Sequence, residues 1–245
     1  MSRSGEGPGG EEAVVEGAAG ERTAEDAAGP EAAAVERAVR AFRAGEPVLL
    51  HDAADREGEV DLVYPAGAVT ADAVARLRSD AGGLICVALG ADVCDAFELP
   101  FAADAVDHPA VGGEPGYDDR SSFSLTVNHR DTFTGVTDED RGLTIRALAD
   151  AAATADGPAA FAERFRVPGH VHLLRGAAGG LAERRGHTEL ALALADAASV
   201  PPAVVVCEML DADSGGALSV AAARDYADRH GLVFLEGRDV VAALG

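Results

Sequence analysis

The chain has 245 residues, and its 42 acidic and 20 basic side chains give it a formal net charge of −22. This charge argues against non-specific binding to nucleic acid, whose phosphates it would repel. No apolar run approaches the ~20 residues of a membrane-spanning helix, and the N-terminus lacks the basic start and apolar core of a secretion signal. All the basic residues are arginine, a composition that suits a protein dissolved at high salt. We therefore expect a cytoplasmic protein from a salt-loving organism.

Residues 1–30 are mostly Gly, Glu, Ala, Ser and Thr, so we predict a disordered acidic tail there. From residue 31 onward, segments with helical spacing alternate with short apolar runs. In chain order we predict helix 31–44, strand 47–50, strand 60–64, helix 70–79, strand 84–89, a long loop 101–120, strand 123–127, helix 138–154, helix 158–164, strand 171–174, helix 187–198, strand 203–207, helix 220–230, strand 232–235 and helix 238–244. This order predicts one domain over 31–245, with a mixed sheet covered by helices on both faces.

The three cysteines, Cys86, Cys94 and Cys207, show neither metal-ligand spacing nor a CxxC motif. An odd number of cysteines without a secretion signal predicts reduced thiols in the cytoplasm. Cys86 and Cys207 lie in apolar runs, and we interpret them as small core residues.

The most informative segment is Arg56-Glu-Gly-Glu-Val-Asp61, which leads into the strand predicted at 60–64. On an extended chain Glu57, Glu59 and Asp61 point to one side, because side chains alternate with a period of two. Three carboxylates on one face repel one another, so the segment predicts a divalent cation such as Mg²⁺, a basic cluster, or both beside it. A solvated acidic loop is the alternative interpretation.

A second candidate segment, Arg184-Arg-Gly-His-Thr-Glu189, ends a glycine-rich loop where the helix 187–198 is expected to begin. A helix start offers free backbone N–H groups and a positive dipole, which suit a phosphate. Arg184, Arg185 and the Thr188 hydroxyl add further donors. His187 can bind a metal through its neutral imidazole. Alternatively, His187 only caps the helix and the arginines are solvated.

Two further segments carry groups suited to proton transfer. Gly169-His170-Val-His172 would place two imidazoles on one face of a strand. Glu208 follows an apolar strand, where desolvation could raise its pKa to a value useful in an acid or base. A carboxylate that faces water at the strand end is the alternative for Glu208.

Taken together, four blocks of this sequence resemble the motifs of 3,4-dihydroxy-2-butanone 4-phosphate synthase. The blocks are Asp55-Arg-Glu-Gly-Glu-Val-Asp61, Arg166-Val-Pro-Gly-His170, Arg184-Arg-Gly-His-Thr-Glu189 and Cys207-Glu208. Their order and spacing match that family from about residue 31 to the C-terminus, and segments 85–89 and 134–141 are similar too. The chain departs from the family at Arg185, where a small residue is usual, at Leu190, and in the loop 101–122.

The resemblance implies a lyase of riboflavin biosynthesis that converts D-ribulose 5-phosphate to L-3,4-dihydroxy-2-butanone 4-phosphate and formate. It implies a three-layered α+β fold with a mixed sheet. It also implies Mg²⁺, with Mn²⁺ as an alternative ion, and a homodimer with shared sites. We expect the stand-alone form, without the GTP cyclohydrolase II domain of many relatives. By the family's pattern Glu57 and His187 hold the metal, and His170, Glu208 and Asp61 are catalytic. The residues implied to contact substrate are Arg56, Glu57, Asp61, Arg184, Arg185, Gly186, His187, Thr188 and Glu208.

The residue types suit this chemistry independently of the family name. The arginines would anchor a phosphate, a metal would polarise the sugar oxygens, and carboxylates with His170 would move protons. The residues leave open whether Asp61 or Glu208 removes the first proton. Two alternatives remain: another metal-dependent sugar-phosphate enzyme, such as an isomerase or aldolase, and a non-catalytic module that binds phosphorylated ligands.

Overall fold

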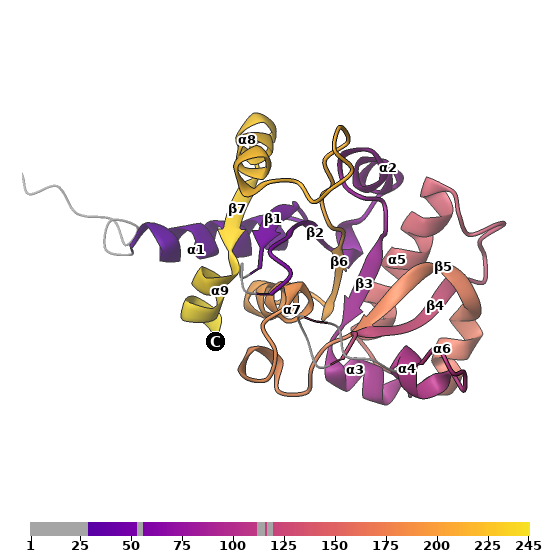
Figure 1. Ribbon diagram of the computed structural model, residues 1–245. Helices are drawn as coiled ribbons and strands as arrows, with labels where there is room; N and C mark the ends of the chain where they lie inside the picture. The colour runs from indigo at the N-terminus through magenta and orange to yellow at the C-terminus, as the bar shows by residue number, and fades with distance from the viewer. Residues whose placement is uncertain (1–28, 53–55, 112–115, 117–119) are drawn as a thin grey trace, which may run out of the picture.

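The computed structural model describes residues 29–52, 56–111, 116 and 120–245. Most of the tail predicted at 1–30 lies outside these residues, as does Asp55 of the acidic motif. Within the described residues the chain forms a seven-stranded sheet with helices on both faces (Figure 1). The predicted α+β class with a mixed sheet is confirmed.

The sheet has the strand order β4-β5-β3-β6-β2-β1-β7. Its strands are β1 (Val48–His51), β2 (Val60–Pro65), β3 (Cys86–Leu89), β4 (Phe123–His129), β5 (Phe165–Arg175), β6 (Ala203–Val206) and β7 (Val233–Glu236). β1 is parallel to β7 and β3 is parallel to β5, whereas the other neighbours are antiparallel. The strands β1, β2, β3 and β6 are buried along their whole length, as expected for a sheet covered on both faces.

The helices form the two outer layers, each with its own apolar core. One face is covered by α1 (Pro30–Arg43), α7 (His187–Ala198) and α9 (Gly237–Leu244). The other is covered by α2 (Ala71–Asp80), α3 (Ala91–Ala96), α5 (Asp138–Ala152), α6 (Pro158–Arg164) and α8 (Val220–His230). None of the described helices has the length and apolar character needed to cross a bilayer.

Local signals explain where several helices begin and end. The Thr70 hydroxyl accepts a hydrogen bond from the backbone N–H of Ala73, which caps the start of α2. The Ser219 hydroxyl does the same for α8, and this helix ends at Gly231, whose φ of +65° lies in the left-handed region. These side chains satisfy backbone groups that a helix end leaves without partners.

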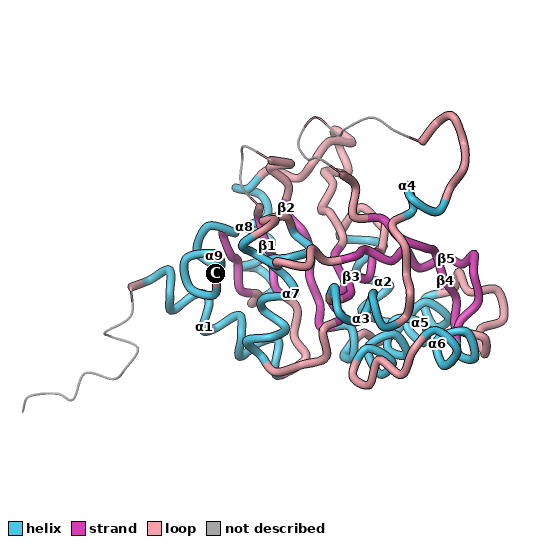
Figure 2. Tube along the Cα trace, turned by 90° about the horizontal axis from the view of Figure 1, so that it is seen from below, coloured by secondary structure: helices cyan, strands magenta, loops and turns pink. Residues whose placement is uncertain are grey.

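Three features differ from the predicted elements. The short helices α3 and α4 (Ala102–Ala105) were not predicted, and α4 lies inside the expected long loop. Figure 2 shows α4 and the chain just after it projecting from the rest of the structure. β5 begins at Phe165, six residues before the predicted start at residue 171. The sequence did not predict this part of the strand, because Pro168 and Gly169 are unfavourable in strand interiors.

The three cysteines are buried and free, as expected.

Candidate active site

The register of three neighbouring strands brings several carboxylates to one end of the sheet. His51, the last residue of β1, pairs with Val60, the first residue of β2. Asp52 therefore lies beside Glu59, and the backbone N–H of Asp52 donates to the Glu59 carbonyl at 3.3 Å. On the other side of β2, Asp61 faces Glu208 in an isolated antiparallel bridge.

A turn before β2 explains how the acidic motif folds. Asp52 Oδ1 accepts hydrogen bonds from the backbone N–H groups of Gly58 at 2.8 Å and Glu59 at 3.3 Å. Gly58 has a φ of +67°, a conformation that glycine adopts without a steric penalty. β2 begins only at Val60, so the predicted strand alternation from Glu57 to Asp61 is wrong. The turn at Gly58, and not a strand, directs Glu57 and Glu59 to the side of Asp61.

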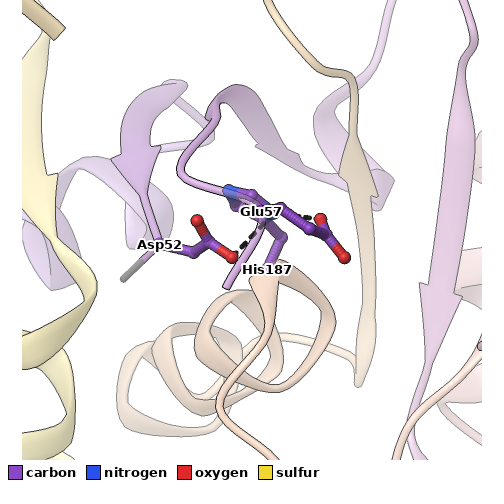
Figure 3. A group of neighbouring side chains, drawn as sticks. All are labelled: Asp52, Glu57 and His187. Carbon is purple, nitrogen blue, oxygen red and sulfur yellow. Dashed lines mark ion pairs between the residues drawn. The ribbon is translucent and has the colours of Figure 1, made fainter. Parts of the chain in front are cut away.

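His187, the first residue of α7, lies between carboxylates from two other segments (Figure 3). Its Nδ1 atom is 3.4 Å from Glu57 Oε2, 3.9 Å from Asp61 Oδ2 and 4.0 Å from Asp52 Oδ2. Its Nε2 atom is 3.2 Å from the Glu59 carbonyl oxygen, which can only accept a hydrogen bond. Nε2 therefore carries a proton, and Nδ1 is the ring atom that faces the carboxylates.

The charges in this cluster shift one another's protonation. Burial lowers the pKa of His187, but Asp61, Glu57 and Asp52 outweigh it and raise that pKa to about 10. Burial raises the pKa of Asp61 to about 7, against the opposing effect of His187. The hydrogen bond with His187 lowers the pKa of Glu57. Near neutral pH the imidazole thus carries a positive charge among several acids, and the Arg56 guanidinium lies beside two of them, 3.6 Å from Asp52 Oδ2 and 3.8 Å from Glu57 Oε1.

The donor set fits a divalent cation. One ligand atom each from Asp52, Glu57 and His187 lies within 4.8 Å of the others, and ligands of one Mg²⁺ ion at ~2.1 Å span at most ~4.2 Å. Two buried oxygens, Asp52 Oδ2 and Asp61 Oδ1, accept no hydrogen bond from the described residues. Asp52 Oδ2 lies 3.6 Å from Arg56 Nε and 4.0 Å from His187 Nδ1, and a cation held by Asp52, Glu57 and His187 would give this buried oxygen a direct ligand contact.

The start of α7 carries the positive side of the site. Glu189 is buried, and its Oε2 accepts from Arg184 Nη1 at 2.8 Å, which orients that guanidinium. Gly186 precedes the helix as its N-cap. A Cβ atom at Gly186 would lie 2.7 Å from Arg184 Nη1 and 3.0 Å from Arg56 Nη2. The absence of a side chain at Gly186 therefore lets two guanidinium groups approach the helix start, where an anion is favoured.

A cavity of about 330 Å³ joins the acidic cluster to these arginines. Predicted site residues that line it are Arg56, Glu57, Asp61, Arg184, His187, Thr188 and Glu208. Burial raises the pKa of Glu208, as the sequence suggested for this strand end. The cavity therefore contains anion-binding, metal-binding and proton-exchanging groups within reach of one small polar molecule.

Two predicted site residues lie elsewhere in this chain. His170 lies on β5 with an exposed side chain and does not line the cavity. Arg185 does not line it either, and its Nε donates to the Leu181 carbonyl at 3.4 Å. Arg185 therefore leaves the anion site uncrowded.

The structure also adds residues that sequence reasoning missed. Asp52 joins the candidate metal ligands, and its position directly after a buried strand was the available signal. Cys86, interpreted as a core residue, is buried but also lines the cavity. Arg120, Ser121 and Ser122 line it from the end of the long loop. Neither composition nor spacing indicates which residues of such a loop reach a site.

This chain is similar in sequence and fold to known proteins of one family. A profile of the 3,4-dihydroxy-2-butanone 4-phosphate synthase family matches residues 36–243. The 3,4-dihydroxy-2-butanone 4-phosphate synthase of Methanosarcina mazei is 49% identical over 222 residues, covering 85% of this chain and 90% of the relative. That of Archaeoglobus fulgidus is 47% identical over 218 residues, covering 84% and 92%. A crystal structure of a 3,4-dihydroxy-2-butanone 4-phosphate synthase in complex with two magnesium ions superposes with a TM-score of 0.73 at 32% identity, covering 85% of this chain and 94% of that one.

Proposed function

Because the chain belongs to the 3,4-dihydroxy-2-butanone 4-phosphate synthase family, we propose that it converts D-ribulose 5-phosphate to L-3,4-dihydroxy-2-butanone 4-phosphate and formate. This is a lyase reaction of riboflavin biosynthesis, and residues 31–245 form the domain that performs it. One observation carries the proposal: the imidazole–carboxylate cluster and the two guanidinium groups at the start of α7 line the same cavity.

The phosphate of the substrate binds at the start of α7. Arg56 and Arg184 supply positive charge over Gly186, and Thr188 lines the same part of the cavity. The free N–H groups of the helix start add donors. Arg185 contributes through its charge alone, because its Nε donates to the Leu181 carbonyl.

Glu57 and His187 hold the metal ion, and Asp52 is a third ligand in this proposal. Mg²⁺ supplies Lewis-acid polarisation of the ketose oxygens when it is bound, and Mn²⁺ can replace it because carboxylate and water oxygens suit both ions. Holding the metal requires a neutral Nδ1 on His187. The hydrogen bond from Nε2 to the Glu59 carbonyl keeps the ring turned so that Nδ1 faces the carboxylates.

Asp61 and Glu208 move protons at the substrate carbons. Asp61 has a pKa of about 7, so near neutral pH it exists in both protonation states and can take up and return a proton. Glu208 lies next to it across the bridge and also has a raised pKa, chiefly through burial. Two neighbouring carboxyls with raised pKa values allow a proton to be removed from one carbon and delivered to another.

We further propose a homodimer in which His170 of one subunit completes the site of the other. His170 is exposed and does not line the cavity of its own chain. Large apolar side chains are exposed near it, with Phe133 at 92%, Val136 at 52% and Val167 at 52%. Burying such a patch favours association. The acidic, lysine-free composition supports a role in the cytoplasm of a salt-loving organism.

Product analysis tests the proposal. Purified protein, ribulose 5-phosphate and Mg²⁺ at high salt should yield formate, EDTA should abolish the reaction, and added Mg²⁺ or Mn²⁺ should restore it. An isomeric sugar phosphate or a triose phosphate in place of formate would identify a different sugar-phosphate enzyme. Binding of the sugar phosphate without turnover would identify a non-catalytic module.

A further inference from the structure

Asn128, on β4, contacts His170 on the neighbouring strand β5 through both ends of its side-chain amide. Asn128 is buried, with 3% of its surface exposed. Its Oδ1 accepts a hydrogen bond from the backbone N–H of His170 at 2.8 Å. Its Nδ2 lies 3.1 Å from His170 Nδ1. One amide therefore contacts both the backbone and the ring of His170.

These contacts determine which way the amide points. The backbone N–H of His170 can only donate, so the amide oxygen must face it. The amide nitrogen then faces His170 Nδ1 and the Thr134 carbonyl, which lies 3.4 Å away. An amide nitrogen can only donate, so the Thr134 carbonyl and His170 Nδ1 are the acceptors that it faces. His170 Nδ1 lies closer to Asn128 Nδ2, at 3.1 Å, than to Asn128 Oδ1, at 3.3 Å, so a lone pair on Nδ1 matches the nearer amide atom.

Two glycines pack closely against Asn128 and the β4 backbone beside it. A Cβ atom at Gly135 would lie 2.0 Å from Asn128 Nδ2, and one at Gly169 would lie 1.9 Å from the Val127 carbonyl carbon. The backbone of both glycines is therefore packed directly against this part of β4. Asp140 holds the first of them, since its Oδ2 accepts from the Gly135 N–H at 2.8 Å.

We propose that Asn128 is a positioning residue that holds His170 as the Nε2–H tautomer. A proton on Nδ1 would point at an N–H of Asn128, whereas a lone pair there accepts from it. The ring then presents an N–H at Nε2, on the side away from Asn128. This inference rests on the proposed function, in which His170 takes part in the reaction. In this tautomer neutral His170 donates a hydrogen bond to a substrate oxygen and does not remove a proton from carbon.

The tautomer can be measured directly in the whole protein by NMR with ¹⁵N-labelled histidine. The His170 signals are assigned by their loss in His170→Gln. We expect the wild-type spectrum, recorded where the ring is neutral, to show Nδ1 without a proton and Nε2 with one. A protonated Nδ1, or an even mixture of the two forms, would overturn the proposal, and this test needs no variant that alters the fold.

The variant Asn128→Asp then tests whether Asn128 sets the tautomer. Aspartate keeps the oxygen that accepts from the His170 backbone but replaces the amide donor with an acceptor. We expect the proton to move to Nδ1, with formate production falling by about a hundredfold, mainly in kcat. Thr126→Val is the matched control, because it removes the Thr126 Oγ1 acceptor of the Gly169 N–H on the same strand pair and leaves the Asn128 amide in place.

The two readouts separate this inference from the proposed function. An unchanged tautomer in Asn128→Asp, or the same tautomer shift in Thr126→Val, would show that Asn128 does not set it. Full formate production by His170→Gln would instead remove His170 from the reaction, whatever its tautomer. The proposal is supported when Asn128→Asp alone changes both the tautomer and kcat.

Discussion

His187 Nδ1 lies 3.4 Å from Glu57 Oε2, which connects the first residue of α7 to the turn before β2. Asp52 lies on the other side of the same nitrogen, at 4.0 Å. The candidate metal ligands come from two distant parts of the chain and meet only when the sheet and α7 are packed together. Metal binding and folding are therefore linked, and the predictions below concern the groups that make this connection.

Glu57→Gln should remove metal binding and activity while the fold is kept. The substitution preserves the shape of the side chain but removes a charged ligand, and the side chain is partly exposed, so packing changes little. We expect metal affinity to fall by at least about tenfold, measured by Mn²⁺ electron paramagnetic resonance, and formate production to be lost. Glu36→Gln, on the exposed face of α1, is the control. Wild-type metal affinity in Glu57→Gln would remove Glu57 from the ligand set.

Asp52→Asn separates the two roles of Asp52. Asparagine keeps an oxygen for the N–H groups of Gly58 and Glu59 but removes the charge next to His187. We expect metal affinity to fall about 10–100-fold with an unchanged circular dichroism spectrum. Asp52→Ala also loses the turn contacts, so its free energy of unfolding should fall by about 1–3 kcal/mol more. Equal metal affinity in Asp52→Asn and wild type would limit Asp52 to holding the turn.

Gly186→Ala should weaken substrate binding more than it slows turnover. The added methyl would lie within 3.0 Å of guanidinium nitrogens from both Arg184 and Arg56, so these groups must move away from the helix start. We expect KM for ribulose 5-phosphate to rise about tenfold, roughly the loss of one charge-assisted hydrogen bond. Gly67→Ala is the control, because its nearest neighbour would be 3.7 Å away. A fall in kcat with an unchanged KM would contradict an anion site at Gly186.

Asp140 should make the free energy of unfolding depend on pH. The hydrogen bond from the Gly135 N–H, followed by those from Phe133 and Thr134, lowers the pKa of Asp140. A carboxyl whose pKa is lower in the folded state stabilises the protein above its unfolded pKa of ~3.9, and this contribution is lost as the pH falls. The free energy of unfolding, measured in urea, should therefore fall less in Asp140→Asn than in wild type between about pH 5 and pH 3. Parallel losses would contradict this contribution.

The sequence was sufficient to predict most of the fold because its signals are local. The helices α6, α7 and α8 begin and end at the predicted residues, and Gly231 ends α8. Short elements escaped prediction. A helix as short as α3 or α4 has less than two full turns, so no periodic pattern can develop.

The site was predictable where one motif supplied several neighbouring groups, as at the start of α7. It was not predictable where the sheet register decides the neighbours. Asp52 approaches His187 because His51 pairs with Val60, a relationship that no local pattern encodes. The sequence alone predicts that strand alternation gathers the acidic cluster, whereas in the structure a turn at Gly58 brings the carboxylates together. The catalytic role of His170 stays a prediction, because that side chain does not line the cavity of its own chain.

The fate of one substrate carbon tests the central claim most directly. Ribulose 5-phosphate labelled with ¹³C at C4 can be incubated with the protein and Mg²⁺ and followed by ¹³C NMR. The proposed reaction requires the label to appear in formate, at the rate at which the substrate disappears. A label retained in a pentose phosphate or in a triose phosphate would contradict the proposed function.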